Sequence, residues 1–246
     1  MIGRRDPIYN SWQPCLTEEL AITEADCDAL RTPETVLQPD FRSRKTDILT
    51  GEPLTIAYEY DAIAKVTLDD RVPRNIRAQF DTSRNLYLYA WFVYRFYPIA
   101  EKQAYACLEL ALRERYAEEL AAVSKRKLAE TTQGLKPLLT YAVEKGHLKN
   151  ENFSLWRNQA EMRARQRTEM EIWEKARQEG LDEFVYDPEE FEIKDVDRDH
   201  DYLQAIISAI PALRNAYAHG SNTLHDKVLY SMVLVSEIIN QIYAAR

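Results

Sequence analysis

An arginine and a histidine lie five positions apart near the C-terminal end of the chain, in the stretch Pro211 to Asn222. The Arg214 guanidinium can hold a phosphate through several donors, and the His219 imidazole can take up or release a proton near neutral pH. Together they suit phosphodiester chemistry without a metal, because one group binds the anion while the other moves protons. No other part of the chain offers comparable chemistry.

These two side chains need a break in the helix that carries them. On a continuous helix, residues five apart are separated by roughly 140° around the axis. Arg214 and His219 therefore converge only if the helix is interrupted, and Gly220, Ser221 and Asn222 supply an interruption. We expect Asn222 to cap a last helix, with His219 near its amino end, where unpaired N–H groups and the helix dipole favour an anion. Convergence across a two-fold dimer axis is the other geometric solution.

The elements that position this junction are predicted to be helices. Glycine is scarce, at six in 246 residues, which favours helices over turn-rich β architecture. Apolar residues recur at three- and four-residue intervals over most of the chain after Asp70. The fold class is therefore an all-α bundle of about five to six helices. The predicted helices run over Pro73 to Tyr97, Pro98 to Tyr116, Leu135 to a stop at Gly146, Ser154 to about Gln178, Tyr202 to about Ala216, and Thr223 to about Ala244.

Residues 1 to 69 are predicted to form an irregular N-terminal extension, because prolines interrupt them and no helical period is sustained. A partly alternating apolar pattern from Leu54 to Leu68 indicates a short β-hairpin there. The helical domain then spans residues 70 to 246. It contains an acidic connection at 182 to 201, where ten acidic residues stand against one lysine, Lys194, and one arginine, Arg198. Such a composition is typical of a solvated, partly flexible segment.

Composition and cysteine usage exclude several classes of protein. Cys15, Cys27 and Cys107 match no zinc spacing and are interpreted as reduced thiols of a cytoplasmic protein. The apolar runs Leu86 to Tyr94 and Leu203 to Leu213 are too short to cross a bilayer, so we expect no membrane association, and also no metal and no cofactor. The net charge of −8 is concentrated in residues 182 to 201, and the balanced charge of the remaining chain argues against a nonspecific nucleic-acid coat but leaves local phosphate contacts open.

The other histidines and the aromatic residues receive structural interpretations. His147 and His200 fall in predicted loops, and His225 is expected on the exposed side of the last helix, away from its amino end. The aromatic run from Tyr87 to Tyr97 favours core packing over base stacking, because stacking aromatics stand on exposed platforms beside basic residues. Basic residues of the helix after Ser154 are interleaved with glutamates, which favours a solvated helix face over a phosphate-tracking rim.

The segment Arg214-Asn-Ala-Tyr-Ala-His219, followed by Gly220, resembles the signature of the HEPN superfamily. That signature is an arginine, a polar residue directly after it, and a histidine after four intervening positions. The form present here is similar to that of abortive-infection and toxin-like members. The resemblance is specific from about Tyr202 to Ala244, extends weakly as a helical bundle back to about Asp70, and covers nothing in residues 1 to 69.

The resemblance implies an all-helical domain that dimerises and brings two copies of the motif into one cleft. Many members cleave RNA without a metal, with the RNA 2′-hydroxyl as nucleophile. Carried onto this chain, His219 would act as general base or acid, Arg214 would bind the scissile phosphate, and Asn215 would orient the site. Tyr217, as a stacking surface, and Asn222 would bind substrate. Products with a 2′,3′-cyclic phosphate follow, as does a toxin or antiviral role with an antitoxin or defence protein as a further partner.

A structural interpretation of the same residues stays open. Arg214 can pair with an acidic neighbour, and His219 can bond a carbonyl at a helix end. The alternative function is a noncatalytic HEPN-like helical module that binds a nucleotide or a protein partner. The histidine at 219 favours the nuclease, because a site that only binds has little need for a proton-transfer group beside its arginine.

Overall fold

The computed structural model describes residues 27–121, 134–179, 187, 189–218 and 224–245. Helices make up most of this part: α2 (Ile56–Ala64), α3 (Arg74–Tyr89), α4 (Phe96–Arg115), α5 (Ala117–Ala121), α7 (Leu135–Glu144), α8 (Ser154–Glu179), α9 (Asp195–Arg198), α10 (Tyr202–Ala218) and α11 (Val228–Ala244), with the 3-10 turns η1 (Phe41–Ser43) and η2 (Asn150–Asn152). Among the described residues the only β pairing is an isolated bridge between Thr46 and Pro53, and the predicted all-α class is confirmed.

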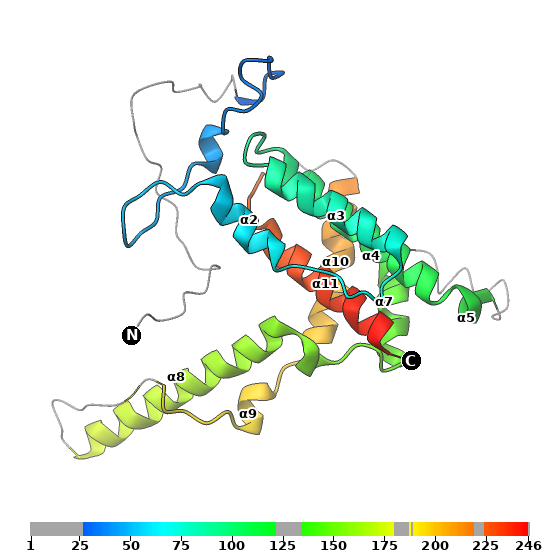
Figure 1. Ribbon diagram of the computed structural model, residues 1–246. Coiled ribbons are helices and arrows are strands. Elements are labelled where there is room, and N and C mark those ends of the chain that lie inside the picture. The colour runs from blue at the N-terminus through cyan, green and yellow to red at the C-terminus, as the bar shows by residue number, and fades with distance from the viewer. Residues whose placement is uncertain (1–26, 122–133, 180–186, 188, 219–223, 246) are drawn as a thin grey trace.

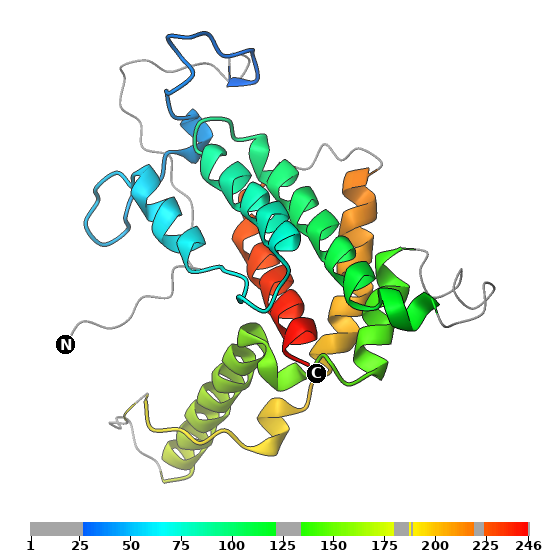
Figure 2. The ribbon, with the colours of Figure 1, turned by 45° about the vertical axis from the view of Figure 1, so that its right-hand side comes forward.

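The helices form a bundle around an antiparallel hairpin of α3 and α4 (Figure 1). α11 runs parallel to α4: the Ser231 hydroxyl, near the N-terminal end of α11, lies 3.1 Å from the Tyr105 hydroxyl, midway along α4. Towards the other end, the Tyr243 hydroxyl donates to the Ala111 carbonyl at 3.2 Å. α10 runs the opposite way, with α7 beside it (Figure 2). The C-terminal end of α10 and the N-terminal ends of α4 and α11 therefore point towards the same end of the bundle (Figure 2).

The apolar stripes predicted from helical spacing lie in the core. Leu108 and Leu112 of α4 and Val235 and Ile239 of α11 are fully buried, and each contributes about 1.5–3 kcal/mol of hydrophobic stabilisation. The predicted stop after α7 is also present, since Gly146 has a φ of 69°, which glycine adopts without strain. α7, α8 and α10 lie close to their predicted bounds, and α2, α5 and α9 are short helices that the periodicity did not indicate.

The single helix predicted from Pro73 to Tyr97 is wrong. α3 ends at Tyr89, the chain turns through residues 90–95, and α4 begins at Phe96 with Pro98 in its first turn. In the turn, some backbone carbonyls have no hydrogen-bond donor within a helix, and the N-terminal segment supplies the donors. The Asp40 N–H donates to the Trp91 carbonyl at 2.9 Å, and the Ser43 hydroxyl donates to the Ala90 carbonyl at 3.2 Å.

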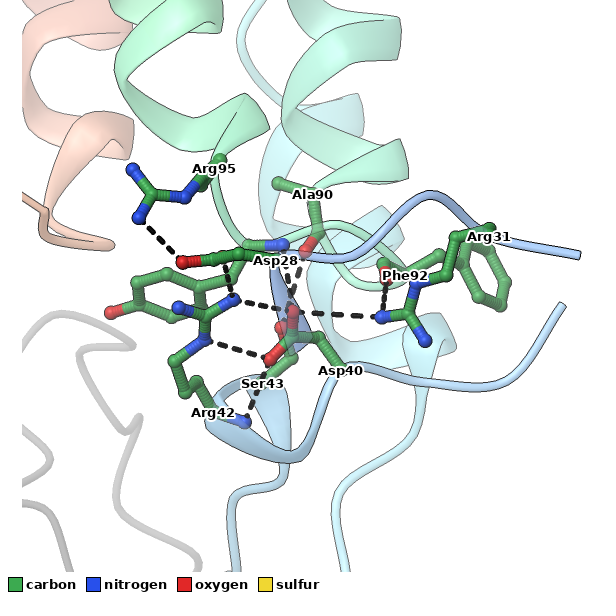
Figure 3. Close-up of polar contacts among 9 residues, drawn as sticks. Asp28, Arg31, Asp40, Arg42, Ser43, Ala90, Phe92 and Arg95 are labelled. Atoms are coloured by element: carbon green, nitrogen blue, oxygen red, sulfur yellow. Dashed lines mark hydrogen bonds and ion pairs between the residues drawn. The ribbon is translucent and has the colours of Figure 1, made fainter. Parts of the chain in front are cut away.

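Asp40 is the centre of this contact, and Figure 3 shows the arginines around it. Its carboxylate is fully buried, accepts two hydrogen bonds of 2.9 Å from the Arg42 guanidinium, and accepts the Tyr94 N–H at 3.3 Å. Arg31 lies 3.6 Å from the same carboxylate and donates to the Phe92 carbonyl at 2.7 Å. A buried charge that is paired in this way stabilises the turn, because backbone groups and counter-ions are satisfied together.

The β-hairpin predicted within Leu54 to Leu68 is also wrong, because Ile56–Ala64 forms α2. α2 packs against α3, and its Ile63, together with Val66 just after it, belongs to the main core. An apolar pattern that alternates over a few residues also fits one buried helix face, so the tertiary contact with α3 decides between the two.

The described part of the acidic connection folds back along α8, which projects from the bundle with α9 beside it (Figures 1 and 2). Arg165 pairs with Glu189 at 2.8 Å and lies 4.5 Å from the centre of the Phe191 ring. Arg167 pairs with the buried carboxylate of Asp197 at 2.8 Å. Most described residues of the connection are exposed, as expected for a solvated segment, although it is tied to α8 at these contacts. The two arginines are occupied by carboxylates, which disfavours a phosphate-tracking rim.

Candidate functional site

Arg214 lies one turn before the C-terminal end of α10, and its side chain is 38% exposed. Its Nη2 donates to Oε2 of Glu109 on α4 at 3.0 Å, and its Nη1 donates to the side-chain oxygen of Asn215 at 3.3 Å. Asn215 is exposed. The structure therefore brings together two of the predicted site residues and adds a carboxylate from another helix.

Glu109 holds a second arginine. Arg113, one turn further along α4, donates from Nη2 to Oε1 of Glu109 at 2.6 Å. The Glu109 side chain is 12% exposed, whereas the Arg113 side chain is 53% exposed. One carboxylate thus lies between two guanidinium groups that come from two helices, and both guanidinium groups are open to solvent.

The remaining predicted site residues fall at the edge of the described chain. His219 and Asn222 lie outside the described residues, as does the side chain of Tyr217, whose backbone is part of α10. α10 is continuous from Arg214 to Ala218, so the interruption expected to bring Arg214 and His219 together comes after Ala218. The convergence of these two side chains stays a prediction.

The last helix begins later than predicted, and this moves His225. α11 starts at Val228 with Lys227 as its N-cap, so the predicted start at Thr223 and the cap at Asn222 are wrong. His225 precedes the helix, and its Nε2 lies 3.6 Å from Oε2 of the buried Glu101. The expectation of an exposed His225 on the last helix is therefore wrong as well.

Glu101 is a buried acceptor on the core side of α4. The Ser231 hydroxyl donates to its Oε1, and the Tyr105 hydroxyl lies 3.0 Å from the same oxygen. The sequence carries a signal for this group, because Glu101 falls in line with Tyr105, Leu108 and Leu112 at helical spacing. A carboxylate on an apolar stripe needs partners from a neighbouring element, since burial without them is costly.

Asp226, the residue after His225, is linked through Lys45 to a second buried carboxylate, Glu59. The Lys45 ammonium lies 2.8 Å from Oε1 of Glu59 and 3.2 Å from Oδ2 of Asp226. The Tyr87 hydroxyl donates to the other oxygen of Glu59 at 2.5 Å, and burial together with Glu59 raises the pKa of Tyr87. The N-terminal region thus fixes the start of α11, a role for residues 27–69 that sequence reasoning missed.

His147 and His200 lie in loops, as predicted. The Tyr116 hydroxyl lies 3.0 Å from Nδ1 of His147, and the His200 ring stacks on Trp156. Burial lowers the pKa of both imidazoles, which favours their neutral forms at neutral pH. Both rings therefore serve packing, and neither adds a charge to the α10–α11 junction.

An open recess of about 530 Å³ lies along α8 and is lined by Arg167, Thr168, Glu171, Glu189, Glu190, Phe191, Glu192 and Lys194. Arg167 and Lys194 both pair with Glu171. Carboxylates outnumber the cations there, so this recess does not suit a nucleic acid.

Comparisons of the chain with family models, curated proteins and solved structures find no match. The likeness to HEPN domains accordingly rests on the motif residues. In the described part of the chain, histidine, cysteine and carboxylate side chains form no group of three or more that could hold a metal ion. None of the described helices combines the length and the apolar character needed to cross a bilayer.

Proposed function

We propose that this protein is a metal-independent endoribonuclease of the HEPN type, in which Arg214 binds the scissile phosphate and His219 transfers protons. The observation that carries the proposal is the position of Arg214, which is solvent-accessible and lies in the last turns of α10, directly before the α10–α11 connection. An arginine that is partly exposed near the end of a helix can contact a polynucleotide from the solvent side. Asn215, also exposed, is placed to orient the strand.

The reaction needs only the RNA and side chains of this protein. The RNA 2′-hydroxyl attacks the adjacent phosphorus while a base removes its proton, and the bond from phosphorus to the 5′-oxygen breaks as an acid protonates that oxygen. The products carry a 2′,3′-cyclic phosphate and a 5′-hydroxyl. Arg214 stabilises the charge that grows on the non-bridging oxygens, an effect worth roughly 10²–10³-fold in rate when a single donor of this kind is removed.

The residues that follow the motif are held in place by contacts with the bundle, which supports this chemistry. His225 and Asp226 are tied to Glu101 and to Lys45, which holds the segment that leads into α11. Catalysis depends on such restraint, because a displacement of about 1 Å can cost on the order of 10²-fold in rate. We further propose that the enzyme acts as a homodimer in a cytoplasmic toxin or antiviral system, with an antitoxin or defence protein as an additional partner.

The test is RNA cleavage in the presence of a chelator. We expect the wild type to release cyclic-phosphate ends, Arg214→Ala and His219→Ala to lose cleavage by at least 10²-fold, and an RNA with 2′-deoxy positions to stay intact. Arg71→Ala, which removes an exposed arginine paired only with Asp69, is the matched control. If each active centre of the dimer combines Arg214 of one subunit with His219 of the other, mixing the two inactive variants restores roughly a quarter of the wild-type activity. Half of the dimers are then mixed, and one of the two centres in each mixed dimer is intact.

Intact RNA at high enzyme concentration would contradict the nuclease and favour the noncatalytic module. The ion pair between Arg214 and Glu109 is the observation on the side of that alternative, because it partly neutralises the arginine that a substrate would need. A binding module predicts that Arg214→Ala weakens ligand binding while no turnover is present to be lost.

A further inference from the structure

Glu109 occupies the position of an anion between two arginines. Arg113 donates to its Oε1 at 2.6 Å and Arg214 donates to its Oε2 at 3.0 Å, so each guanidinium addresses a different oxygen of one charged group. The two non-bridging oxygens of a phosphodiester offer the same pattern of acceptors. Arginines recognise carboxylates and phosphates through the same planar fork of donors.

The arrangement can be reached from solvent on its arginine side. The Arg113 and Arg214 side chains are 53% and 38% exposed, whereas the Glu109 side chain is 12% exposed. An incoming phosphate can therefore bind the solvent-facing donors of the two arginines, for which the largely buried Glu109 carboxylate competes. The three charges sum to one net positive charge, so the internal carboxylate weakens an anion site without cancelling it.

A further basic residue extends the same face of α4. Lys102 precedes Glu109 by seven positions, which places it within roughly 20° of the same line along the helix and about 10 Å towards its N-terminal end. Lys102 is exposed. Because α10 runs opposite to α4, this is the direction in which α10 continues from Arg214 towards its end. A strand bound at the arginines can follow α4 to Lys102.

We propose that Arg113 and Arg214 form a two-arginine clamp for a phosphate of single-stranded RNA, with Glu109 as an internal competitor for the clamp. The ligand class rests on the proposed function, whereas the clamp does not require that the protein cleave what it binds. Arg113 is then a substrate-binding residue, and Glu109 sets how tightly the site holds RNA.

The direction in which RNA affinity changes in the Glu109→Gln variant separates a role in binding from a purely structural role. Glu109→Gln keeps the shape of the side chain and removes its charge, so the clamp is expected to bind RNA roughly 3- to 10-fold tighter. Arg113→Ala is expected to weaken binding by a similar factor and to lower the slope of log affinity against log salt concentration by about one. Glu144→Gln removes the same charge from an exposed position of α7 and serves as the matched control.

The experiment measures fluorescence anisotropy of a labelled 2′-O-methyl RNA oligonucleotide, which cannot be cleaved, with the full chain at several salt concentrations. Inorganic phosphate is added as a competitor to distinguish a general anion site from an RNA site. A polynucleotide can contact Lys102 as well as the two arginines, whereas a single phosphate cannot, so RNA should compete more strongly. Tighter binding by Glu109→Gln alone supports the clamp, even if the wild type cleaves no RNA. The clamp is overturned if RNA affinity rises equally in Glu109→Gln and Glu144→Gln, or if it rises in neither. It is also overturned if millimolar phosphate displaces the oligonucleotide as strongly as unlabelled RNA does. If Glu109→Gln is poorly folded, unchanged affinity and salt slope in Arg113→Ala overturn it independently.

Discussion

Asp40 and Glu109 are both carboxylates held between arginines, yet they sit in opposite surroundings. Asp40 is fully buried under the α3–α4 turn, where Arg42 donates to its carboxylate (Figure 3). The Tyr94 N–H donates to the same carboxylate. Glu109 is 12% exposed and lies between two helices, and its arginine partners are 38% and 53% exposed. The same pair of chemical groups is a structural link in the first case and an exchangeable contact in the second, because burial and backbone donors make the first costly to break.

The largest expected effect is the loss of Asp40. Asp40→Ala leaves the arginines and the turn without their common acceptor, so the free energy of unfolding is expected to fall by about 3–5 kcal/mol, as when one partner of a buried pair is removed. Denaturant unfolding followed by circular dichroism measures it. Glu109→Gln is the counterpart, with a change below about 1 kcal/mol. Similar losses in both variants would break the contrast between the two sites.

Lys45 tests an intermediate case, since its ammonium is partly exposed while the carboxylate of Glu59 is buried. Lys45→Met leaves Glu59 with the Tyr87 hydroxyl but without a counter-ion, and the expected loss is about 2–3 kcal/mol. Because Lys45 also holds Asp226, amide hydrogen exchange should rise at residues 224–227 beyond the global change. Lys45→Arg is the control and should restore most of the protection. A uniform rise across the bundle would count against a specific tie to this connection.

The smallest expected effect concerns Asp28, the more exposed carboxylate of the Asp40 cluster, and appears in the pH dependence of the unfolding free energy. Hydrogen bonds from Arg95 and Arg42 lower the pKa of Asp28 to about 2, against roughly 3.9 in an unfolded chain. In the window between these values the unfolded state binds more protons, so the stability from Asp28 is present above about pH 4 and is lost as the pH falls towards 2. We expect about 1 kcal/mol in that window, because Asp28 is partly exposed.

Asp28→Asn should flatten the dependence of the unfolding free energy on pH between about 4.5 and 2, relative to the wild type. Urea titrations at several pH values measure this slope. An unchanged slope in Asp28→Asn would mean that the arginines prefer Asp40 alone, and the cluster would then contain one structural carboxylate rather than two.

The local features of this chain were readable from the sequence because helical period, proline and glycine act over a few residues. The apolar stripes of α4 and α11, the stop at Gly146 and the start of α8 near Ser154 follow from spacing within one element. The run from Tyr87 to Tyr97 was different. It is apolar nearly all round, so its pattern contains no mark of the turn that divides α3 from α4.

The tertiary structure decided what depends on partners far away in the chain. The α3–α4 turn is held by Asp40, some fifty residues upstream, His225 is drawn to Glu101 of α4, and Arg214 meets Glu109 across 105 positions. Local sequence carries the propensity of each segment and the chemistry of each side chain. Which charge lies beside which, and whether it is buried or exchangeable, is determined only when the helices pack, because pairing and desolvation are properties of the assembled bundle.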